Sequence, residues 1–296
     1  QAVADPNFST VKSPNPEEAG AFEYAIKLGT ELDADILVAT DPDADRLGAA
    51  VRKVKGEYVV LTGNQIASLM LDYLLRAKKA AGTLPANGTA LKSIVSSELP
   101  TAIAKSYGAD MVDVLTGFKF IAEKIKQYEE DHSKEFLFGF EESYGYLAKP
   151  FVRDKDAIQA LVLIAEVAAY YKKKGQTLYD GLVEIFETHG YYKEQTISVT
   201  MSGITGAEKI KALMAQFRTE APADFAGIAV SITEDFGNST KTFSDGSTES
   251  IDMPSSNVLK YFLEDGSWIA IRPSGTEPKI KFYIGAKAES QAAVDE

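Results

Sequence analysis

The sequence contains no cysteine, only two histidines and no apolar run of the roughly 18 residues that a membrane-spanning helix needs. The lack of cysteine excludes disulfide bonds, thiolate zinc sites and a cysteine nucleophile. His132 and His189 both lie near the ends of predicted helices, and neither has a triad partner nearby in the sequence. We therefore expect no membrane partner and no chemistry based on cysteine or on a histidine triad.

Basic residues are also few, since 31 Lys and Arg face 43 Asp and Glu, for a net charge of −12. Such a balance argues against nucleic acid or an anionic membrane surface as a partner. At 296 residues and 45% hydrophobic content the chain can form two or three domains with buried cores. The composition fits a cytoplasmic enzyme, and we expect that location.

Two kinds of hydrophobic pattern follow one another along the chain. Helical and strand patterns alternate up to about residue 190, including a short apolar strand at 36–39 and another strand at 92–97. From Tyr191 onward short strands predominate around one helix at about 206–218. The alternation predicts an α/β fold: three-layer, mostly parallel α/β domains followed by a smaller α+β domain with an antiparallel sheet. We place the domains at 1–61, 62–190 and 191–296.

Three carboxylates at alternate positions, Asp41, Asp43 and Asp45, follow the apolar strand at 36–39. In a tight loop they can converge on a hard cation such as Mg²⁺, which prefers oxygen ligands. An EF-hand is excluded because loop positions six and twelve hold Arg46 and Arg52 instead of Gly and Glu. A solvated acidic turn and a phosphatase with an aspartyl nucleophile remain alternatives. Arg46 either neutralises the acids or holds a phosphoryl group beside the metal.

Polar groups also follow two later strands. Glu141, Glu142 and Ser143 come directly after the apolar run 136–140, and hydroxyl and carboxylate groups are suited to binding a polyol. The segment Thr116-Gly-Phe-Lys119 lies where a strand ends and a helix begins, which favours an anion and places Lys119 over the ligand edge as a cation or proton donor. A charged loop and an ordinary turn are the structural alternatives.

Near the C-terminus, Arg272, Ser274, Gly275 and Thr276 form a loop suited to phosphate. Arg binds phosphate with two parallel hydrogen bonds, hydroxyls donate, and Gly lets a backbone N–H face the anion. Arg153 and Lys155 add positive charge before a helix that one of the aspartates of Arg153-Asp-Lys-Asp156 is expected to cap. A plain turn is the alternative for the 272–276 loop.

Four segments in this order resemble the α-D-phosphohexomutase family, particularly its phosphoglucomutases. They are Thr40-Asp-Pro-Asp-Ala-Asp-Arg46, Thr116-Gly-Phe-Lys119, Phe138-Gly-Phe-Glu-Glu-Ser-Tyr-Gly145 and Arg272-Pro-Ser-Gly-Thr276. The resemblance implies the latter part of domain two, all of domain three and most of domain four of a four-domain fold.

The resemblance also implies roles for individual residues. Asp41, Asp43 and Asp45 would bind Mg²⁺, and Arg46 would lie beside the transferred phosphoryl group. Lys119 is implied to transfer a proton. The substrate-binding residues would be Glu141, Ser143, Lys155, Arg272, Ser274, Gly275 and Thr276. The substrate would be a hexose phosphate, and the sequence Glu-Glu-Ser-Tyr-Gly is more like that of the glucose-preferring members.

One family element has no counterpart in the sequence, namely the Thr-Ala-Ser-His-Asn-Pro-type segment whose phosphorylated Ser is the phosphoryl donor and a metal ligand. We therefore expect a fragment of a mutase that interconverts glucose 1-phosphate and glucose 6-phosphate, inactive alone, with the missing N-terminal domain of the same protein as its partner. A phosphomannomutase or phosphopentomutase is the alternative within the family. A metal-dependent aspartyl phosphatase and a non-catalytic sugar-phosphate-binding module are the alternatives outside it.

Overall fold

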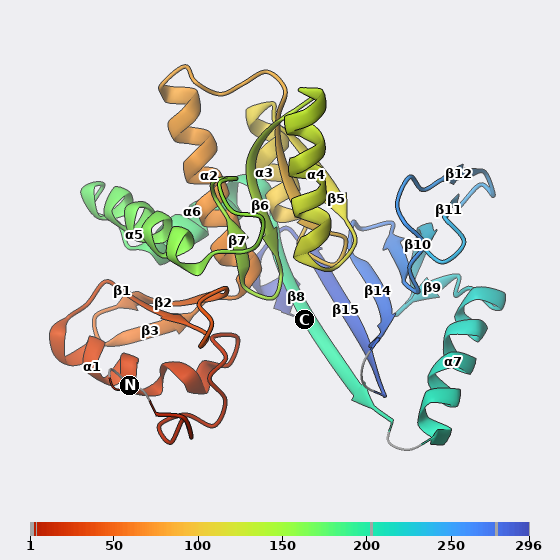
Figure 1. The fold of residues 1–296 in the computed structure, drawn as a ribbon, viewed down its shortest axis with the longest axis horizontal. Helices are drawn as coiled ribbons and strands as arrows, with labels where there is room; N and C mark the ends of the chain where they lie inside the picture. Colours follow the sequence, from red (N-terminus) through yellow and green to blue (C-terminus); the bar gives the residue numbers. More distant parts are fainter. Residues whose placement is uncertain (1–2, 4, 202–203, 276–277, 296) are drawn as a thin grey trace. The chain divides into compact units, whose positions relative to one another are not determined.

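The computed structural model describes residues 3, 5–201, 204–275 and 278–295, and the chain forms two compact units, residues 1–189 and 190–296 (Figure 1). The first unit holds a small antiparallel sheet and a mostly parallel sheet, and the second holds a long antiparallel sheet. This mixed α/β architecture confirms the predicted fold class. The division into three domains at 61/62 and 190/191 stays a prediction.

The first sheet is a three-stranded antiparallel meander of β1 (Ile36–Thr40), β2 (Leu47–Val54) and β3 (Glu57–Val60). It follows a 3₁₀ turn (Ala19–Phe22) and α1 (Glu23–Leu32), which ends at Asp33 in the left-handed conformation. The 36–39 run is a strand as predicted, but our placement of it in an open parallel sheet is wrong for the described residues. Since Thr40 pairs with Leu47, the acidic loop 41–46 is the connection of an antiparallel hairpin.

The second sheet has the order β5-β4-β6-β7, with three parallel strands and one antiparallel edge strand. Its strands are β4 (Gly88–Ser93), β5 (Asp110–Val114), β6 (Glu135–Glu141) and β7 (Gly145–Leu147). Its helices are α2 (Gly63–Ala80), α3 (Leu99–Tyr107), α4 (Phe118–Asp131), α5 (Ala157–Lys173) and α6 (Leu178–His189). The parallel arrangement brings the carboxyl ends of β4, β5 and β6 to one edge.

One prediction for this sheet needs correction, and one strand was missed. The strand expected at 92–97 is β4 at Gly88–Ser93, because Ile94 and Val95 are buried in the loop that follows the strand and not in the strand itself. The short strand β7 was not predicted, since three residues are too few for a periodic signal.

Local capping explains where two long helices begin. The Thr62 side chain accepts from the Gln65 N–H while the Gln65 side chain accepts from the Thr62 N–H, which is a capping box at the start of α2. Asp156 accepts from the N–H groups of Ile158 and Gln159 at the start of α5, so it is the capping aspartate that was expected within 153–156. On one side of the sheet, α4 packs its apolar residues against Leu91 and Val114.

The second unit is an antiparallel sheet of order β12-β11-β10-β13-β14-β15-β8, with β9 paired to β10. Its strands are β8 (Tyr191–Thr200), β9 (Asp224–Phe225), β10 (Ile228–Asp235), β11 (Thr240–Phe243), β12 (Thr248–Ser250), β13 (Leu259–Leu263), β14 (Trp268–Pro273) and β15 (Lys279–Ala288). The helices are α7 (Ile204–Thr219) and α8 (Gln291–Asp295). The predicted antiparallel α+β arrangement is confirmed, and β9, β11, β12 and α8 were not predicted.

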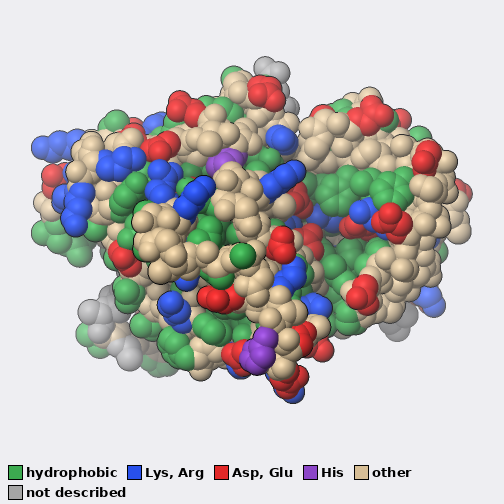
Figure 2. Space-filling view, turned by 90° about the horizontal axis from the view of Figure 1, so that it is seen from above, with side chains coloured by type: hydrophobic (Ala, Val, Ile, Leu, Met, Phe, Trp, Pro, Cys, Tyr) green, Lys and Arg blue, Asp and Glu red, His purple; other side chains and the backbone are tan. Residues whose placement is uncertain are grey.

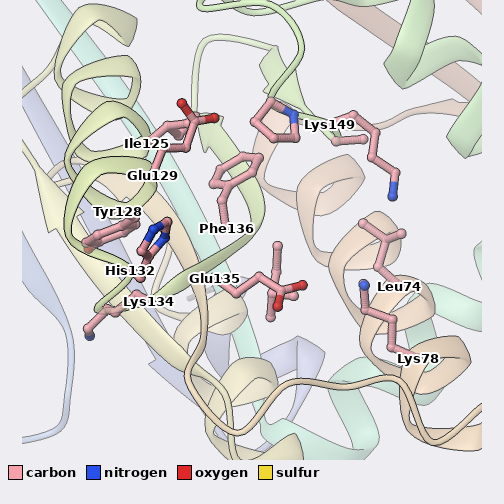
Figure 3. Close-up of a pocket in the computed structure, with 13 residues that line it drawn as sticks. Leu74, Lys78, Ile125, Tyr128, Glu129, His132, Lys134, Glu135, Phe136 and Lys149 are labelled. Carbon is pink, nitrogen blue, oxygen red and sulfur yellow. The ribbon is translucent and has the colours of Figure 1, made fainter.

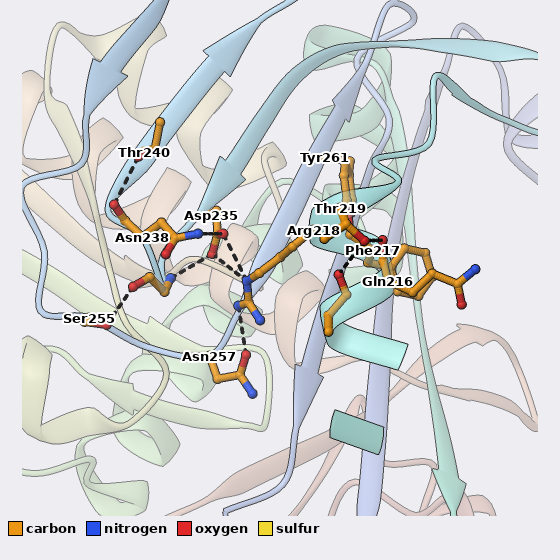
Figure 4. Close-up of polar contacts among 12 residues, drawn as sticks. Gln216, Phe217, Arg218, Thr219, Asp235, Asn238, Thr240, Ser255, Asn257 and Tyr261 are labelled. Atoms are coloured by element: carbon orange, nitrogen blue, oxygen red, sulfur yellow. Dashed lines mark hydrogen bonds and ion pairs between the residues drawn. The ribbon is translucent and has the colours of Figure 1, made fainter. Parts of the chain in front are cut away.

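A polar network fastens α7 to the sheet of the second unit (Figure 4). Arg218 Nε donates to both carboxylate oxygens of Asp235 at 3.0 and 3.2 Å, and Arg218 Nη2 donates to Asn257 Oδ1 at 2.8 Å. Asp235 also accepts from Asn238 Nδ2 at 2.6 Å. The guanidinium therefore joins the helix to the β10–β11 turn and to the segment before β13.

The surface carries charges of both signs. Figure 2 shows Asp and Glu side chains intermixed with Lys and Arg side chains on one face. Among the described residues, no helix combines the length and the apolar character needed to cross a membrane.

Candidate functional site

The loop 41–46 is a tight turn that gathers three carboxylates. Asp41 Oδ1 accepts from the backbone N–H groups of Asp45 and Arg46 at 3.1 and 3.0 Å, and Ala44 has a φ of +56°. One carboxylate oxygen each of Asp41, Asp43 and Asp45 lies within 4.8 Å of the others. The spacing of two in the sequence thus becomes convergence in space, because the chain turns back on itself.

The electrostatics of this loop fit a divalent cation. Burial raises the pKa of Asp41, and the neighbouring carboxylates of Asp45 and Asp43 raise it further. Asp45 Oδ1 is buried and has no hydrogen-bond partner. Clustered oxygens that repel one another, one of them without a donor, match the ligand set of Mg²⁺.

Two cationic side chains already lie beside the carboxylates. Lys155 Nζ is 2.6 Å from Asp45 Oδ2, and Arg46 Nη1 donates to Glu17 Oε1 at 2.7 Å. Arg46 Nε lies 3.7 Å from Asp41 and 3.8 Å from Asp45. Lys155 thus occupies Asp45 Oδ2, whereas Asp45 Oδ1 has no hydrogen-bond partner and is the oxygen that a metal ion would bind.

Glu141 ends β6 and is 6% exposed. Its Oε1 accepts from the N–H of Gly117 at 2.7 Å, which joins the predicted polyol-binding loop to the Thr116–Lys119 segment. Burial, followed by repulsion from Glu142, raises the pKa of Glu141 to about 7. Near neutral pH this carboxyl group is therefore partly protonated, so that it can either donate or accept a hydrogen bond.

The acidic loop and the 141–145 loop lie side by side. Arg46 forms a β-bridge with Gly145, and the Leu47 N–H donates to the Tyr144 carbonyl at 3.0 Å. A Cβ on Gly145 would come within 2.5 Å of Lys155 Cδ, so Gly lets the lysine stem pass over the turn toward Asp45. The structure thus brings together two motifs that are far apart in the sequence, and adds Lys155 to them.

The Thr116–Lys119 segment, which was predicted to bind an anion and to place Lys119 over the ligand edge, has the following surroundings in the structure. Gly117 has a φ of +121°, and Thr116 Oγ1 is buried without a hydrogen-bond partner. Lys119 is exposed, and its Nζ lies 4.9 Å from the centre of the Phe120 ring. Together with Arg153 it lines a cavity of about 540 Å³. Arg153 donates to the Pro150 carbonyl and to Glu129.

The predicted phosphate loop belongs to the second unit. Arg272 lies on β14 directly opposite Lys281 of β15, and the Ser274 N–H donates to the Lys279 carbonyl at 2.8 Å. Ser274 also lines a cavity of about 480 Å³ with Lys211 and Arg218 of α7. Gly275 is exposed at the turn. Thr276 lies outside the described residues.

Three further residues near the acidic loop and the 141–145 loop were not predicted from the sequence to contribute to the site. They are Glu17, which binds Arg46, and Ser93 and Ser96, which bind Glu142. The two serines could have been predicted, because they lie at the end of β4 and just beyond it, and the carboxyl end of β4 adjoins that of β6.

A separate cavity of about 390 Å³ lies at the opposite end of β6 (Figure 3). Leu74 and Lys78 of α2 lie on one side of it, and Tyr128 and His132 of α4 lie on the other. Because its strand residues come from the start of β6 and Glu141 from the end, this cavity is not part of the site described above.

Comparison with known protein families decides the identity of the fold. Residues 1–56, 62–186 and 206–296 match, in order, the models of the phosphoglucomutase/phosphomannomutase alpha/beta/alpha domain II, alpha/beta/alpha domain III and C-terminal domain. The chain belongs to this family. The recognition made from the four loops is therefore confirmed.

Individual family members agree with this assignment. A phosphoglucomutase of Staphylococcus aureus (strain MRSA252) is 44% identical over 288 residues, which are 97% of this chain and 51% of that protein. The chain thus spans about half the length of the curated relatives it matches. Among solved structures, parafusin, a phosphoglucomutase from Paramecium, has a TM-score of 0.64 at 19% identity, over 94% of this chain and 46% of that one.

A Burkholderia thailandensis protein of the phosphoglucomutase/phosphomannomutase family has a TM-score of 0.59 at 16% identity, over 95% of this chain and 48% of that one. At such identities the likeness to the solved structures concerns the fold alone.

Because Lys155 and Arg46 already neutralise part of the negative charge of the acidic loop, we expect Mg²⁺ to bind this chain weakly. A ligand at a concentration near its Kd stabilises the folded state by only about 0.4 kcal/mol. Thermal melting with and without millimolar Mg²⁺ measures this, and Asp43→Asn should abolish the small shift because one of the three converging carboxylates is lost. A large shift that survives Asp43→Asn would place the metal elsewhere.

Proposed function

We propose that this chain carries the metal-, sugar- and phosphate-binding loops of a mutase that interconverts glucose 1-phosphate and glucose 6-phosphate through a bisphosphate. The observation that carries the proposal is the juxtaposition of the acidic loop with the 141–145 loop, joined by the Arg46–Gly145 bridge and the Lys155–Asp45 ion pair. A phosphoryl group held between these loops would meet carboxylates for a metal on one side and groups for sugar hydroxyls on the other.

The phosphorylated Ser that the reaction requires is not found in a family-type segment of this sequence. We propose that it belongs to a further segment of the same protein, so that this chain alone is inactive as a mutase. The half-length match to the Staphylococcus aureus enzyme supports this proposal.

Each acidic-loop residue then has a chemical task. Asp41, Asp43 and Asp45 would hold Mg²⁺, which when bound supplies positive charge to the transferred phosphoryl group. Arg46, already next to Asp41 and Asp45, would hold a phosphoryl oxygen if its guanidinium left Glu17. Lys155, which lies near Asp45 and Glu141, would stabilise negative charge on the transferred phosphoryl group.

The sugar and the distant phosphate would be held by the other loops. Glu141 and Ser143 would bind sugar hydroxyls, and Lys119 would transfer a proton. Arg272, Ser274, Gly275 and Thr276 would bind the phosphate that does not react. Holding both ends of the substrate lowers the entropic cost of reaching the reactive geometry.

The choice of sugar is tested by binding. Calorimetric titration of the chain with glucose 6-phosphate, mannose 6-phosphate and ribose 5-phosphate should give the tightest binding for the glucose compound. A preference for mannose or ribose would favour the phosphomannomutase or phosphopentomutase alternative. A phosphate-mimicking fluoride adduct on Asp41 would instead indicate the aspartyl phosphatase.

The contribution of the second unit is tested by Arg272→Ala. We expect the variant to bind glucose 6-phosphate more weakly by about 1.5–3 kcal/mol, the range for a hydrogen bond to a charged group. Lys193→Ala is a matched control, because Lys193 is a cation of the same unit that pairs with Asp295 and lies outside the proposed loop. Unchanged affinity in the Arg272 variant would remove this residue from the phosphate site.

A further inference from the structure

The side chain of Glu142 is bound by two serines, of which Ser93 ends β4 and Ser96 lies in the loop that follows it. Glu142 Oε2 accepts from Ser93 Oγ at 2.8 Å and from Ser96 Oγ at 3.3 Å, and the Glu142 N–H donates to Ser96 Oγ at 3.1 Å. The two serine hydroxyls also lie 2.9 Å apart. Backbone and side chain of Glu142 are therefore both held by the segment that follows β4.

Both serines are fully buried, at 0% exposure. They reach Glu142 because β4 and β6 are parallel neighbours whose carboxyl ends meet at one edge of the sheet. The two serine hydroxyls are also within hydrogen-bond distance of each other, so movement of Glu142 would cost them their bonds to its carboxylate and to its N–H but not every partner. The three residues form a closed unit, which we call the Glu142 anchor.

The backbone around the anchor tolerates little movement. Tyr144 has a φ of +67°, a conformation that is unfavourable for a large side chain, and its hydroxyl donates to the Leu61 carbonyl at 3.3 Å. A Cβ on Gly63 would lie 2.2 Å from the Glu142 carbonyl oxygen, so this turn packs directly on the first residue of α2. A strained turn of this kind persists only where its surroundings determine it.

The residues on either side of Glu142 have different environments. Glu141 accepts from Gly117, and the half-buried Ser143 hydroxyl has no hydrogen-bond partner among the described residues. With Glu142 committed to the serines, Ser143 remains available to a ligand. Glu142 lies between them, so the hydrogen bonds of its side chain and of its backbone N–H hold the stretch of backbone to which both neighbours belong.

We propose that Glu142, Ser93 and Ser96 are positioning residues that set the geometry of Glu141 and Ser143 for sugar hydroxyls. This inference rests on the proposed function, since it assigns the anchor to the sugar-binding loop of that site. Glu142 itself is thereby assigned to support of the loop and not to contact with the sugar. Sites that bind ligands depend on such supporting hydrogen bonds to hold their contacting groups in place.

The test compares the double variant Ser93→Ala/Ser96→Ala with Ser97→Ala. Ser97 is equally buried in the same loop, but its hydroxyl accepts from the Leu99 N–H and does not contact Glu142. Two measurements are made on the full chain: the Kd for glucose 6-phosphate by calorimetry, and hydrogen exchange of the Glu142 amide. Thermal melting identifies any variant that has lost its fold.

We expect the double variant to bind about tenfold more weakly, which corresponds to one hydrogen bond, and to exchange the Glu142 amide faster. Ser97→Ala should change neither quantity. Glu142→Gln should keep most of the affinity, since its amide oxygen still accepts from Ser93, whereas Glu142→Ala should lose it as the double variant does. Native affinity and native exchange in a folded double variant or in folded Glu142→Ala would overturn the proposal.

The two measurements separate this inference from the proposed function. If the unmodified chain binds none of the sugar phosphates, the proposed function of the chain is contradicted, and the exchange rate of the Glu142 amide still decides whether the anchor holds the turn. If the chain binds glucose 6-phosphate and the double variant binds it equally well, only the anchor is contradicted.

Discussion

Replacing Glu141 with Gln is expected to stabilise the chain above pH 7 by about 3 kcal/mol and to leave it nearly unchanged at pH 4.5. Burial raises the pKa of Glu141 from 4.5 in the unfolded chain to about 7 in the folded one. The folded state therefore binds more protons than the unfolded state between these pH values. Stability that is fully present below pH 4.5 is lost as the pH rises through 7, when a buried carboxylate must carry charge.

Gln removes this penalty without removing the hydrogen bond, because its amide oxygen can still accept from the Gly117 N–H. Denaturant unfolding of both proteins at pH 4.5, 6 and 9 measures the difference. Glu135→Gln is the control, since Glu135 begins the same strand and is exposed. A stability difference between wild type and Glu141→Gln that does not change from pH 4.5 to 9 would contradict the assigned environment of Glu141.

The same substitution should act in the opposite sense on ligand binding. Glu141 is proposed to bind sugar hydroxyls, and Gln offers a weaker acceptor than a carboxylate. Gain of stability with loss of affinity is the pattern expected where a site keeps a buried charge for function.

Replacing Lys92 with Ala should lower the free energy of unfolding by about 3 kcal/mol, the lower end of the range for breaking a buried ion pair. Lys92 lies on the central strand β4 with 0% exposure, and its Nζ is 3.0 Å from both Glu98 and Asp113. Burial alone would lower the pKa of Lys92, but Asp113 and Glu98 raise it, so the lysine stays charged. The lower end applies because the two carboxylates keep side-chain exposures of 24% and 32%.

Two further variants separate charge from volume. Lys92→Met fills most of the space that Ala leaves empty, so it should cost less than Ala by the part due to the cavity. Lys134→Ala removes a half-exposed lysine that pairs with Asp110 and should cost at most about 1 kcal/mol. Equal and small losses for the Lys92 and Lys134 variants in chemical denaturation would show that the buried pair contributes little.

Much of the fold followed from local patterns. The alternation of helices and strands up to residue 190 predicted the parallel sheet, because each crossover helix leaves a periodic apolar face. A capping aspartate was predicted before α5, because the side chains of Asp residues satisfy free N–H groups, and the structure shows that it is Asp156. Short strands such as β7 and β12 were missed, since three residues carry no period. The position of β4 was displaced because the apolar residues Ile94 and Val95 are buried whether they lie in a strand or in a loop.

The candidate site divides in a similar way. The acidic loop, the Glu141–Ser143 loop and the phosphate loop were predicted to bind ligands from residue types alone, because metal and phosphate binding demand particular chemical groups within a few residues of one another, and these roles stay predictions. Which of these loops meet is a question of long-range pairing. The bridge between Arg46 and Gly145 and the contact of Lys155 with Asp45 depend on packing between segments about a hundred residues apart.

Tertiary packing also gives chemically identical residues different surroundings and therefore different roles. Glu141 and Glu142 are adjacent and chemically identical, yet one is buried against Gly117 and the other accepts from two serines at and just beyond the end of β4. Nothing local distinguishes them, since a carboxylate takes its pKa and its partners from whatever the fold places around it. The short motifs thus determine which chemical groups the chain carries. Which partners each group contacts depends on which strand ends the sheet brings together.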